Sequence, residues 1–259
     1  MNLTEHIQER LRHKRILLMT HAVVGFPSLQ ANWDMLEIMQ KAGVDLVELQ
    51  LPFTEPSADG ELFVKANQAA LKSGIRIDDY FAFMQKATAA FDFPIFMMSY
   101  YNPVFVMGHQ TVCQRLKESG SWGYILPDLP VEEYGDLFEY SKAAGLHPIL
   151  LCAPTNTPQR LRKIAQQGSG FLYCVARKGV TGAKTDINEN VDDFITRCRD
   201  CSELSIALGF GLSKGEDIQD LHGKVEIAIV GSALLRSWLE KGPEGYQNHL
   251  TELVENCFP

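Results

Sequence analysis

The chain has 259 residues, a formal net charge of −8 at pH 7 and a hydrophobic content of 46%. These values are typical of a folded globular protein and exclude a disordered or fibrous chain. The acidic balance and the lack of a long basic block make nucleic acid and anionic membranes poor partners, and no apolar run approaches the roughly 18 residues of a transmembrane helix.

The predicted elements alternate between helices and strands along the whole chain. Leu3, Ile7 and Leu11 recur at helical spacing, which predicts a helix ahead of the first strand. After it, short apolar runs alternate with longer helix-like segments, a pattern that is typical of a parallel sheet covered by helices. We expect strands over residues 16–23, 44–51, 94–100, 123–129, 148–153, 171–176, 205–210 and 225–231.

Eight strand–helix units predict an α/β fold of the (β/α)8 or TIM-barrel type, formed as a single domain over residues 1–259. The competing architecture is an open doubly wound sheet, which places a nucleotide-binding fingerprint after its first strand. That position reads THAVVGFPS and has no G-x-G-x-x-G motif, so the barrel is favoured. We expect extra helices at the N-terminus and in the loops after strands 2 and 8.

Two acidic residues near the end of the second strand are candidates for catalysis. Glu48 stands in the apolar run VDLVELQL, where strand alternation puts it on one face with Leu46 and Gln50. Asp59 follows on the long loop that leaves this strand, and Glu55 is a third acid there. Carboxylates in different surroundings can divide into acid and base. The alternatives are a buried acid satisfied by a neighbour and a turn-forming Asp-Gly pair.

Three glycine-rich segments follow the last three strands: GVTGA at 179–183, GFGLS at 209–213 and VGSA at 230–233. Backbone N–H groups without a shielding side chain can cradle a phosphate, and the N-terminus of a following helix favours an anion. Barrel enzymes often bind phosphate after strands 7 and 8. The sequence therefore predicts a phosphate site, to which the hydroxyl of Ser232 can also contribute.

No metal or cofactor motif is present. The sequence has no H-E-x-x-H, no Walker A motif and no paired spacing of metal ligands, and Cys198 and Cys201 form an isolated C-x-x-C. We therefore expect no metal. His21 lies near the end of the first strand, but no serine or cysteine nucleophile partners it by motif. The N-terminal stretch lacks the apolar core of a signal peptide, so we also expect a cytoplasmic protein with reduced cysteines.

Several segments together resemble the alpha subunit of tryptophan synthase over nearly the whole chain. They are LVELQLPFTEPSADG, MMSYYNPVF, GYILPDLPVEE, GFLYCVARKGVTGA and IALGFGLS. The resemblance implies a cofactor-free retro-aldol cleavage of indole-3-glycerol phosphate to indole and glyceraldehyde 3-phosphate. It assigns Glu48 as the proton shuttle and Asp59 as the acceptor of the indole N–H.

The same resemblance implies the remaining site residues. The phosphate would rest on Gly182, Gly211, Gly231 and Ser232, and Thr181 would meet Asp59 on closure of its loop. Met98, Pro127, Leu151, Tyr173 and Phe210 would wall the indole, with Tyr100 at the same strand ends.

The partner implied by the resemblance is the beta subunit of tryptophan synthase, in an alpha-beta-beta-alpha complex, which would receive indole through a tunnel. Pro52, Glu55, Asn102 and Pro103 would face it. Two other functions stay open. One is a free-standing lyase that releases indole without a partner, and the other is a non-catalytic activator of the beta subunit, against which the intact carboxylates argue.

Three features depart from the family pattern. Gln50 stands where the family usually has Gly, Glu55 replaces the commoner Asp, and THAVVGFPS differs from the commoner T-A-G-(D/Y)-P form. We expect none of them to touch the catalytic pair. We expect Gln50 and Glu55 to lie on the loop that couples to the partner.

Overall fold

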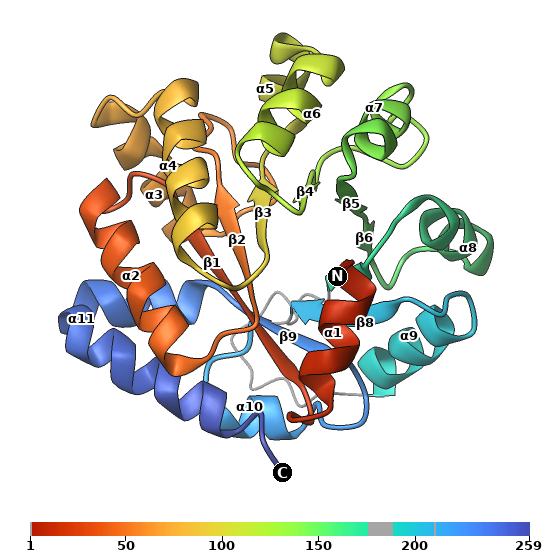
Figure 1. Ribbon diagram of the computed structural model, residues 1–259. Coiled ribbons are helices and arrows are strands. Elements are labelled where there is room, and N and C mark those ends of the chain that lie inside the picture. The colour runs from red at the N-terminus through yellow and green to blue at the C-terminus, as the bar shows by residue number, and fades with distance from the viewer. Residues whose placement is uncertain (1, 176–188, 210) are drawn as a thin grey trace.

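The protein is a parallel β-barrel surrounded by helices (Figure 1). The computed structural model describes residues 2–175, 189–209 and 211–259. Every strand pair is parallel, and the sheet order is β5-β4-β3-β2-β1-β9-β8-β7-β6. The strands are β1 (Leu17–Val23), β2 (Leu46–Gln50), β3 (Ile95–Met98), β4 (Gly123–Ile125), β5 (His147–Ile149), β6 (Leu151–Cys152), β7 (Phe171–Val175), β8 (Ser205–Gly209) and β9 (Ile227–Val230).

The barrel closes through a single interrupted strand. The two ends of the sheet, β5 and β6, are consecutive pieces of chain separated only by Leu150. Together they occupy the fifth predicted strand, so the eight predicted strands are all present at their expected positions. The (β/α)8 prediction is confirmed, and the open doubly wound sheet is excluded.

The helices lie outside the barrel, apart from the first (Figure 1). The predicted extra helix after the second strand is α3, and α11 joins two helices across a kink at Gly242, which Pro243 follows. An extra helix after the third strand, α5, was not predicted. The bounds are α1 (Leu3–Leu11), α2 (Leu29–Ala42), α3 (Glu61–Lys72), α4 (Ile77–Ala90), α5 (Tyr101–Met107), α6 (His109–Glu118), α7 (Leu137–Ala144), α8 (Pro158–Gln167), α9 (Glu189–Arg199), α10 (Gly215–Gln219) and α11 (Ser232–Glu255).

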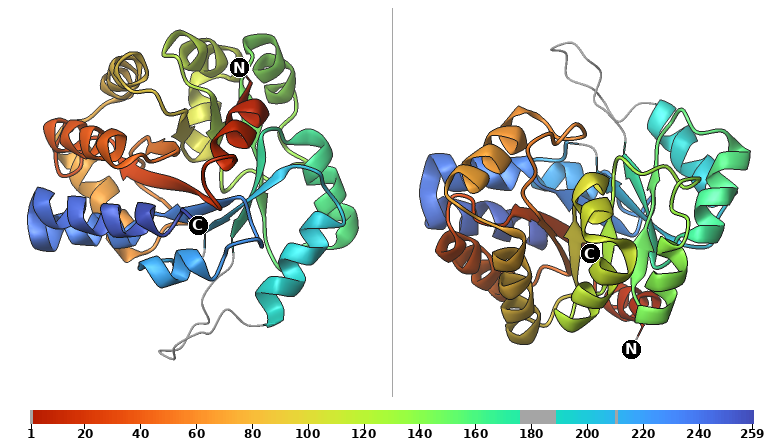
Figure 2. Two further views of the ribbon diagram at one scale, coloured as in Figure 1. Left: turned by 60° about the horizontal axis from the view of Figure 1, so that its bottom comes forward. Right: turned by 90° about the horizontal axis from the view of Figure 1, so that it is seen from above.

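Apolar residues divide between the inside of the barrel and the layer between strands and helices. Leu17, Met19 and Leu46 belong to the interior cluster, whereas Val47 and Leu49 pack in the outer one. This alternation follows from the two-residue period of a strand, and it points Glu48 into the barrel as predicted. Helix α1 closes one end of the barrel with Leu3 and Ile7, and both views of Figure 2 show it at that end.

A buried ion pair anchors the strand that carries Glu48. The carboxylate of Asp45 contacts Lys14 Nζ at 2.7 Å and Arg10 Nη2 at 2.6 Å, and it accepts the backbone N–H of Leu18 at 2.9 Å. These contacts join α1, β1 and β2 at the amino ends of the strands. Within the described ranges, none of the helices is long and apolar enough to span a membrane.

Candidate active site

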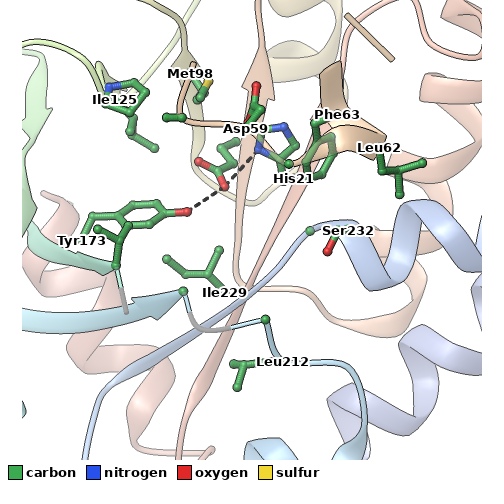
Figure 3. Close-up of a pocket in the computed structure, with 18 of the residues that line it drawn as sticks. His21, Asp59, Leu62, Phe63, Met98, Ile125, Tyr173, Leu212, Ile229 and Ser232 are labelled. Atoms are coloured by element: carbon green, nitrogen blue, oxygen red, sulfur yellow. Dashed lines mark hydrogen bonds and ion pairs between the residues drawn. The ribbon is translucent and has the colours of Figure 1, made fainter. Parts of the chain in front are cut away.

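A cavity of about 460 Å³ lies at the carboxyl ends of the strands, opposite α1. It contains both predicted catalytic carboxylates and several of the predicted pocket residues. Figure 3 shows Tyr173 and His21 reaching toward each other from different sides of it. The described residues that line it include His21, Glu48, Asp59, Phe63, Met98, Ile125, Pro127, Leu151, Tyr173, Gly211, Ile229, Gly231, Ser232 and Arg236.

Glu48 is held between two side chains deep in the cavity. It is only 2% exposed. Its Oε1 lies 3.1 Å from His21 Nδ1 and accepts the hydroxyl of Tyr173 at 3.3 Å. Burial, reinforced by the nearby Glu48 carboxylate, holds the pKa of the Tyr173 hydroxyl well above its usual value, so Tyr173 remains a hydrogen-bond donor at neutral pH.

His21 is a site residue that the sequence analysis did not assign. It stands opposite Glu48 in the β1–β2 register, and Phe63 packs edge-on against its ring at 4.5 Å. Burial disfavours the charged ring, but Glu48, Asp59 and Gln50 outweigh it and raise the pKa of His21 above its ordinary value. Strand alternation was a usable signal, because Leu17, Met19 and His21 fall on the same face of β1.

Gln50 connects this group to Asp59, and this overturns two of our expectations, that Gln50 lies on the coupling loop and that it does not touch the predicted catalytic pair. Gln50 is fully buried at the end of β2 and is not on the loop. Its amide nitrogen donates to Asp59 Oδ2 at 2.7 Å, and its oxygen lies 2.9 Å from His21 Nε2. Two of the three departures from the family pattern, at Gln50 and at His21 within THAVVGFPS, therefore touch the predicted catalytic pair.

The loop that carries Asp59 is held by two buried polar side chains. Tyr100 does not line the cavity, in contrast to our prediction. Its hydroxyl accepts the backbone N–H of Ala58 at 3.1 Å, one residue before Asp59. The amide of Asn67 accepts the N–H of Phe53 at 2.9 Å and donates to the carbonyl of Phe63 at 2.8 Å. Tyr100 thus acts on the site through the loop backbone.

The predicted phosphate residues that the structure describes gather on one side of the cavity. Gly231 and Ser232 stand at the N-terminus of α11, and Gly211 follows β8 with a φ of +67°. A Cβ at Gly231 would come within 3.1 Å of Phe63, so a side chain there would crowd the wall. Arg236, one helical turn beyond Ser232, also lines the cavity and was not predicted. Gly182, Thr181 and Phe210 lie outside the described residues.

The remaining walls are apolar. The predicted residues Met98, Pro127, Leu151 and Tyr173 all line the cavity. Phe63, Ile125 and Ile229 line it too and were missed, although inward-facing positions at strand ends are the ones that alternation selects for Ile125 and Ile229. Within the described part of the chain, no group of three or more His, Cys, Asp or Glu residues is placed to hold a metal ion.

The predicted interface residues differ in exposure. Glu55 and Asn102 are exposed, Pro103 is half-buried and Pro52 is buried in the chain alone, and their place in an interface stays a prediction. Next to Asn102 on α5, Phe105 is 66% exposed, and its neighbour Val106 is as open to solvent.

A parallel eight-unit barrel with an acidic cavity at the carboxyl ends of its strands defines the class of (β/α)8-barrel enzymes. The family profile described as Tryptophan synthase alpha chain matches residues 7–258. The chain therefore belongs to the tryptophan synthase alpha chain family.

Individual relatives agree with this assignment. The alpha chain of Syntrophotalea carbinolica is 44% identical over 236 residues, which cover 91% of this chain and 93% of the relative. That of Desulfotalea psychrophila is 43% identical, with 94% and 96% covered. Among solved structures, Mycobacterium tuberculosis tryptophan synthase has a TM-score of 0.92 at 26% identity, with 99% and 98% covered. The tryptophan synthase a2b2 complex of Pyrococcus furiosus has a TM-score of 0.86 at 29% identity, with 94% and 99% covered.

Proposed function

We propose that this chain cleaves indole-3-glycerol phosphate into indole and glyceraldehyde 3-phosphate without a cofactor. The observation that carries the proposal is the composition of one cavity. Glu48 and Asp59 line it together with apolar walls, and the N-terminus of α11 borders its other side. An aromatic ring needs apolar walls, a phosphate needs free N–H groups, and a retro-aldol cleavage needs groups that move protons.

Glu48 and Asp59 take complementary roles in the reaction. Glu48 donates a proton to C3 of the indole, which makes the ring an electron sink, and Asp59 accepts the indole N–H and stabilises the positive charge on the ring. The bond between C3 and the glycerol carbon then breaks. The hydroxyl on that carbon loses its proton to Glu48 as the aldehyde forms, so the proton that Glu48 gave up is restored.

The phosphate end is formed by Gly211, Gly231 and Ser232, with Arg236 as an added cation. Ser232 offers a hydroxyl and begins a helix whose N-terminal N–H groups and dipole favour an anion. Arg236 lies on the same face because residues four apart on a helix are neighbours. This end binds the substrate without taking part in bond cleavage.

A substitution at Glu48 tests the proposal. Glu48→Gln keeps the shape of the side chain, so it should bind inorganic phosphate as the parent does. Indole release should fall at least about 10²-fold, because the loss of a general acid and base typically removes 10²–10⁴-fold. Asp59→Asn, which keeps the shape and loses the charge, should be similarly impaired. Turnover of Glu48→Gln within a few-fold of the parent would overturn the assignment.

We further propose that the chain passes indole to a tryptophan synthase beta subunit. Exposed apolar residues on α5, Phe105 and Val106, adjoin Asn102, and Glu55 is exposed on the loop that carries Asp59. Large apolar side chains open to solvent are typical of a surface that a partner covers. A partner that holds this loop would act directly on the position of Asp59.

One observation favours the alternative of a free-standing lyase. Asp59 is already tied into the cavity by Gln50 in the chain alone. Indole release measured with and without a beta subunit separates the possibilities. Strong stimulation supports the complex, high activity that the beta subunit leaves unchanged supports the free-standing lyase, and activation of the beta subunit by an inactive alpha chain supports an activator.

A further inference from the structure

A continuous chain of hydrogen bonds runs from one catalytic carboxylate to the other. Asp59 Oδ2 accepts the Gln50 amide at 2.7 Å, Gln50 Oε1 lies 2.9 Å from His21 Nε2, and His21 Nδ1 lies 3.1 Å from Glu48 Oε1. Gln50 and Glu48 are buried, and the His21 side chain is 7% exposed. Solvent therefore has little access to these groups and cannot readily replace the hydrogen bonds between them.

The donor and the acceptor of each hydrogen bond in this series can be assigned by starting from the Asp59 carboxylate. A carboxylate only accepts, so the NH₂ group of Gln50 faces Asp59 and its oxygen faces the histidine. That oxygen also only accepts, so His21 Nε2 must carry a hydrogen. The second nitrogen, Nδ1, is thereby directed at Glu48.

The contact between His21 Nδ1 and Glu48 Oε1 then holds one proton. With no proton, two lone pairs would face each other, and with two protons, two hydrogens would collide. With one, the pair is either an imidazolium beside a carboxylate or a neutral ring beside a carboxylic acid. The Tyr173 hydroxyl donates to Oε1 in both arrangements, and because a donor stabilises a carboxylate more than a carboxylic acid, it favours the imidazolium beside the carboxylate.

We propose that His21 is a positioning residue that shares a single proton with Glu48, and that Gln50 maintains this state by orienting His21 and binding Asp59. The inference deepens the proposed function and rests on it for its role in cleavage. Glu48 passes the shared proton to C3 of the indole and recovers one from the glycerol hydroxyl, so the pair begins and ends each turnover with one proton. Neither an oxidant nor a cofactor is needed.

The surroundings of His21 support the shared proton. Glu48 faces it from β2 and Asp59 lies beyond Gln50, while Tyr173 on β7 contributes a neutral hydroxyl. Phe63 on α3 and Gly231 after β9 bring no charge, and Arg236 on α11 is a cation on the same cavity. The raised pKa of His21, in spite of its burial, agrees with the proximity of the carboxylates.

The first test measures the shared proton without any reaction. The ring nitrogens of ¹⁵N-histidine-labelled full-length protein are titrated by NMR, with the His21 signal assigned by its absence in His21→Asn. Glu48→Gln should move the His21 midpoint down by about one pH unit or more, because burial remains and the neighbouring anion is gone. An unchanged midpoint would overturn the inference, whatever the enzyme's activity.

The second test uses the pH profile of kcat/KM for indole release. His21→Asn places an amide near the position of Nδ1, so it can hydrogen-bond to Glu48 but cannot hold the proton. The basic limb of the profile should move down by about one pH unit or more, with a tenfold greater loss at high pH than at low pH. An equal loss at every pH would show that His21 has a structural role only.

Tyr173→Phe is the matched control, since it removes the other hydrogen bond to Glu48 Oε1 without changing the number of protons. Loss of a donor makes the carboxylate a stronger base, so the basic limb should not move to lower pH. A downward shift as large as that of His21→Asn would refute the assignment to His21. If the parent released no indole, the proposed function would fail while the NMR titration still decided the shared proton.

Discussion

Asp45→Asn should strongly destabilise the protein, because it removes the charge that Lys14 needs. The Lys14 side chain is 4% exposed. Among the hydrogen bonds of the described residues, its ammonium donates only to the Asp45 carboxylate and to the carbonyl of Gly43, the latter at 2.6 Å. Removing one partner of a buried ion pair typically costs about 3–5 kcal/mol. Arg10 is 40% exposed, so water can solvate its guanidinium, and breaking the Arg10–Asp45 pair costs at most about 1 kcal/mol of the loss.

The free energy of unfolding from urea denaturation, followed by circular dichroism, measures this effect. A loss of about 3–5 kcal/mol is a large part of the 5–15 kcal/mol that stabilises a typical domain. Lys65→Gln breaks an exposed pair with Glu61 and should change stability by less than about 0.5 kcal/mol. The double variant Lys14→Met/Asp45→Asn should recover part of the loss. A change below about 1 kcal/mol for Asp45→Asn, with an unaltered denaturant slope, would refute the reasoning.

Three further predictions concern the phosphate end, the partner and pH. Arg236→Gln should raise KM about tenfold with kcat little changed, as expected for a lost charge-assisted contact; steady-state kinetics on the substrate decide it. Phe105→Ala and Glu55→Ala should each leave the activity of the isolated chain unchanged and weaken stimulation by the beta subunit, and equal stimulation of parent and variants would contradict a role in coupling. Burial lowers the pKa of His147 in the folded protein. The neutral His147 ring therefore stabilises the fold above its unfolded-state pKa of about 6.5, and this stabilisation is lost as pH falls through its folded-state pKa. The parent should therefore lose stability relative to His147→Asn on acidification, in urea titrations at pH 7 and pH 5.

The strands and the direction of their side chains were predictable from local information. Apolar runs and a two-residue period located all eight strands, and the same period turned Glu48 inward beside Leu46. The glycines after strands 7 and 8 could also be located from the sequence, and the phosphate site that they would form stays a prediction. Family resemblance supplied the roles of Glu48 and Asp59, which spacing alone left open beside a satisfied buried acid and an ordinary turn.

The pocket assignment of Tyr100 failed because it depended on packing. Tyr100 follows a barrel strand as the pocket residues do, yet its hydroxyl turns to the backbone of Ala58. The direction of a side chain beyond a strand end follows no sequence period, so it could not be read from the pattern.

The sequence by itself determined the barrel, the inward position of Glu48 and the glycines at the strand ends, because each depends on neighbours within a few residues along the chain. Only the tertiary structure decided that His21 and Gln50 join the two carboxylates. His21 lies 29 residues before Gln50, and the two meet because the parallel register sets His21 opposite Glu48 and Val23 opposite Gln50. Register is a property of two paired strands, and a hydrogen-bonded chain of four side chains exists only once that pairing has formed.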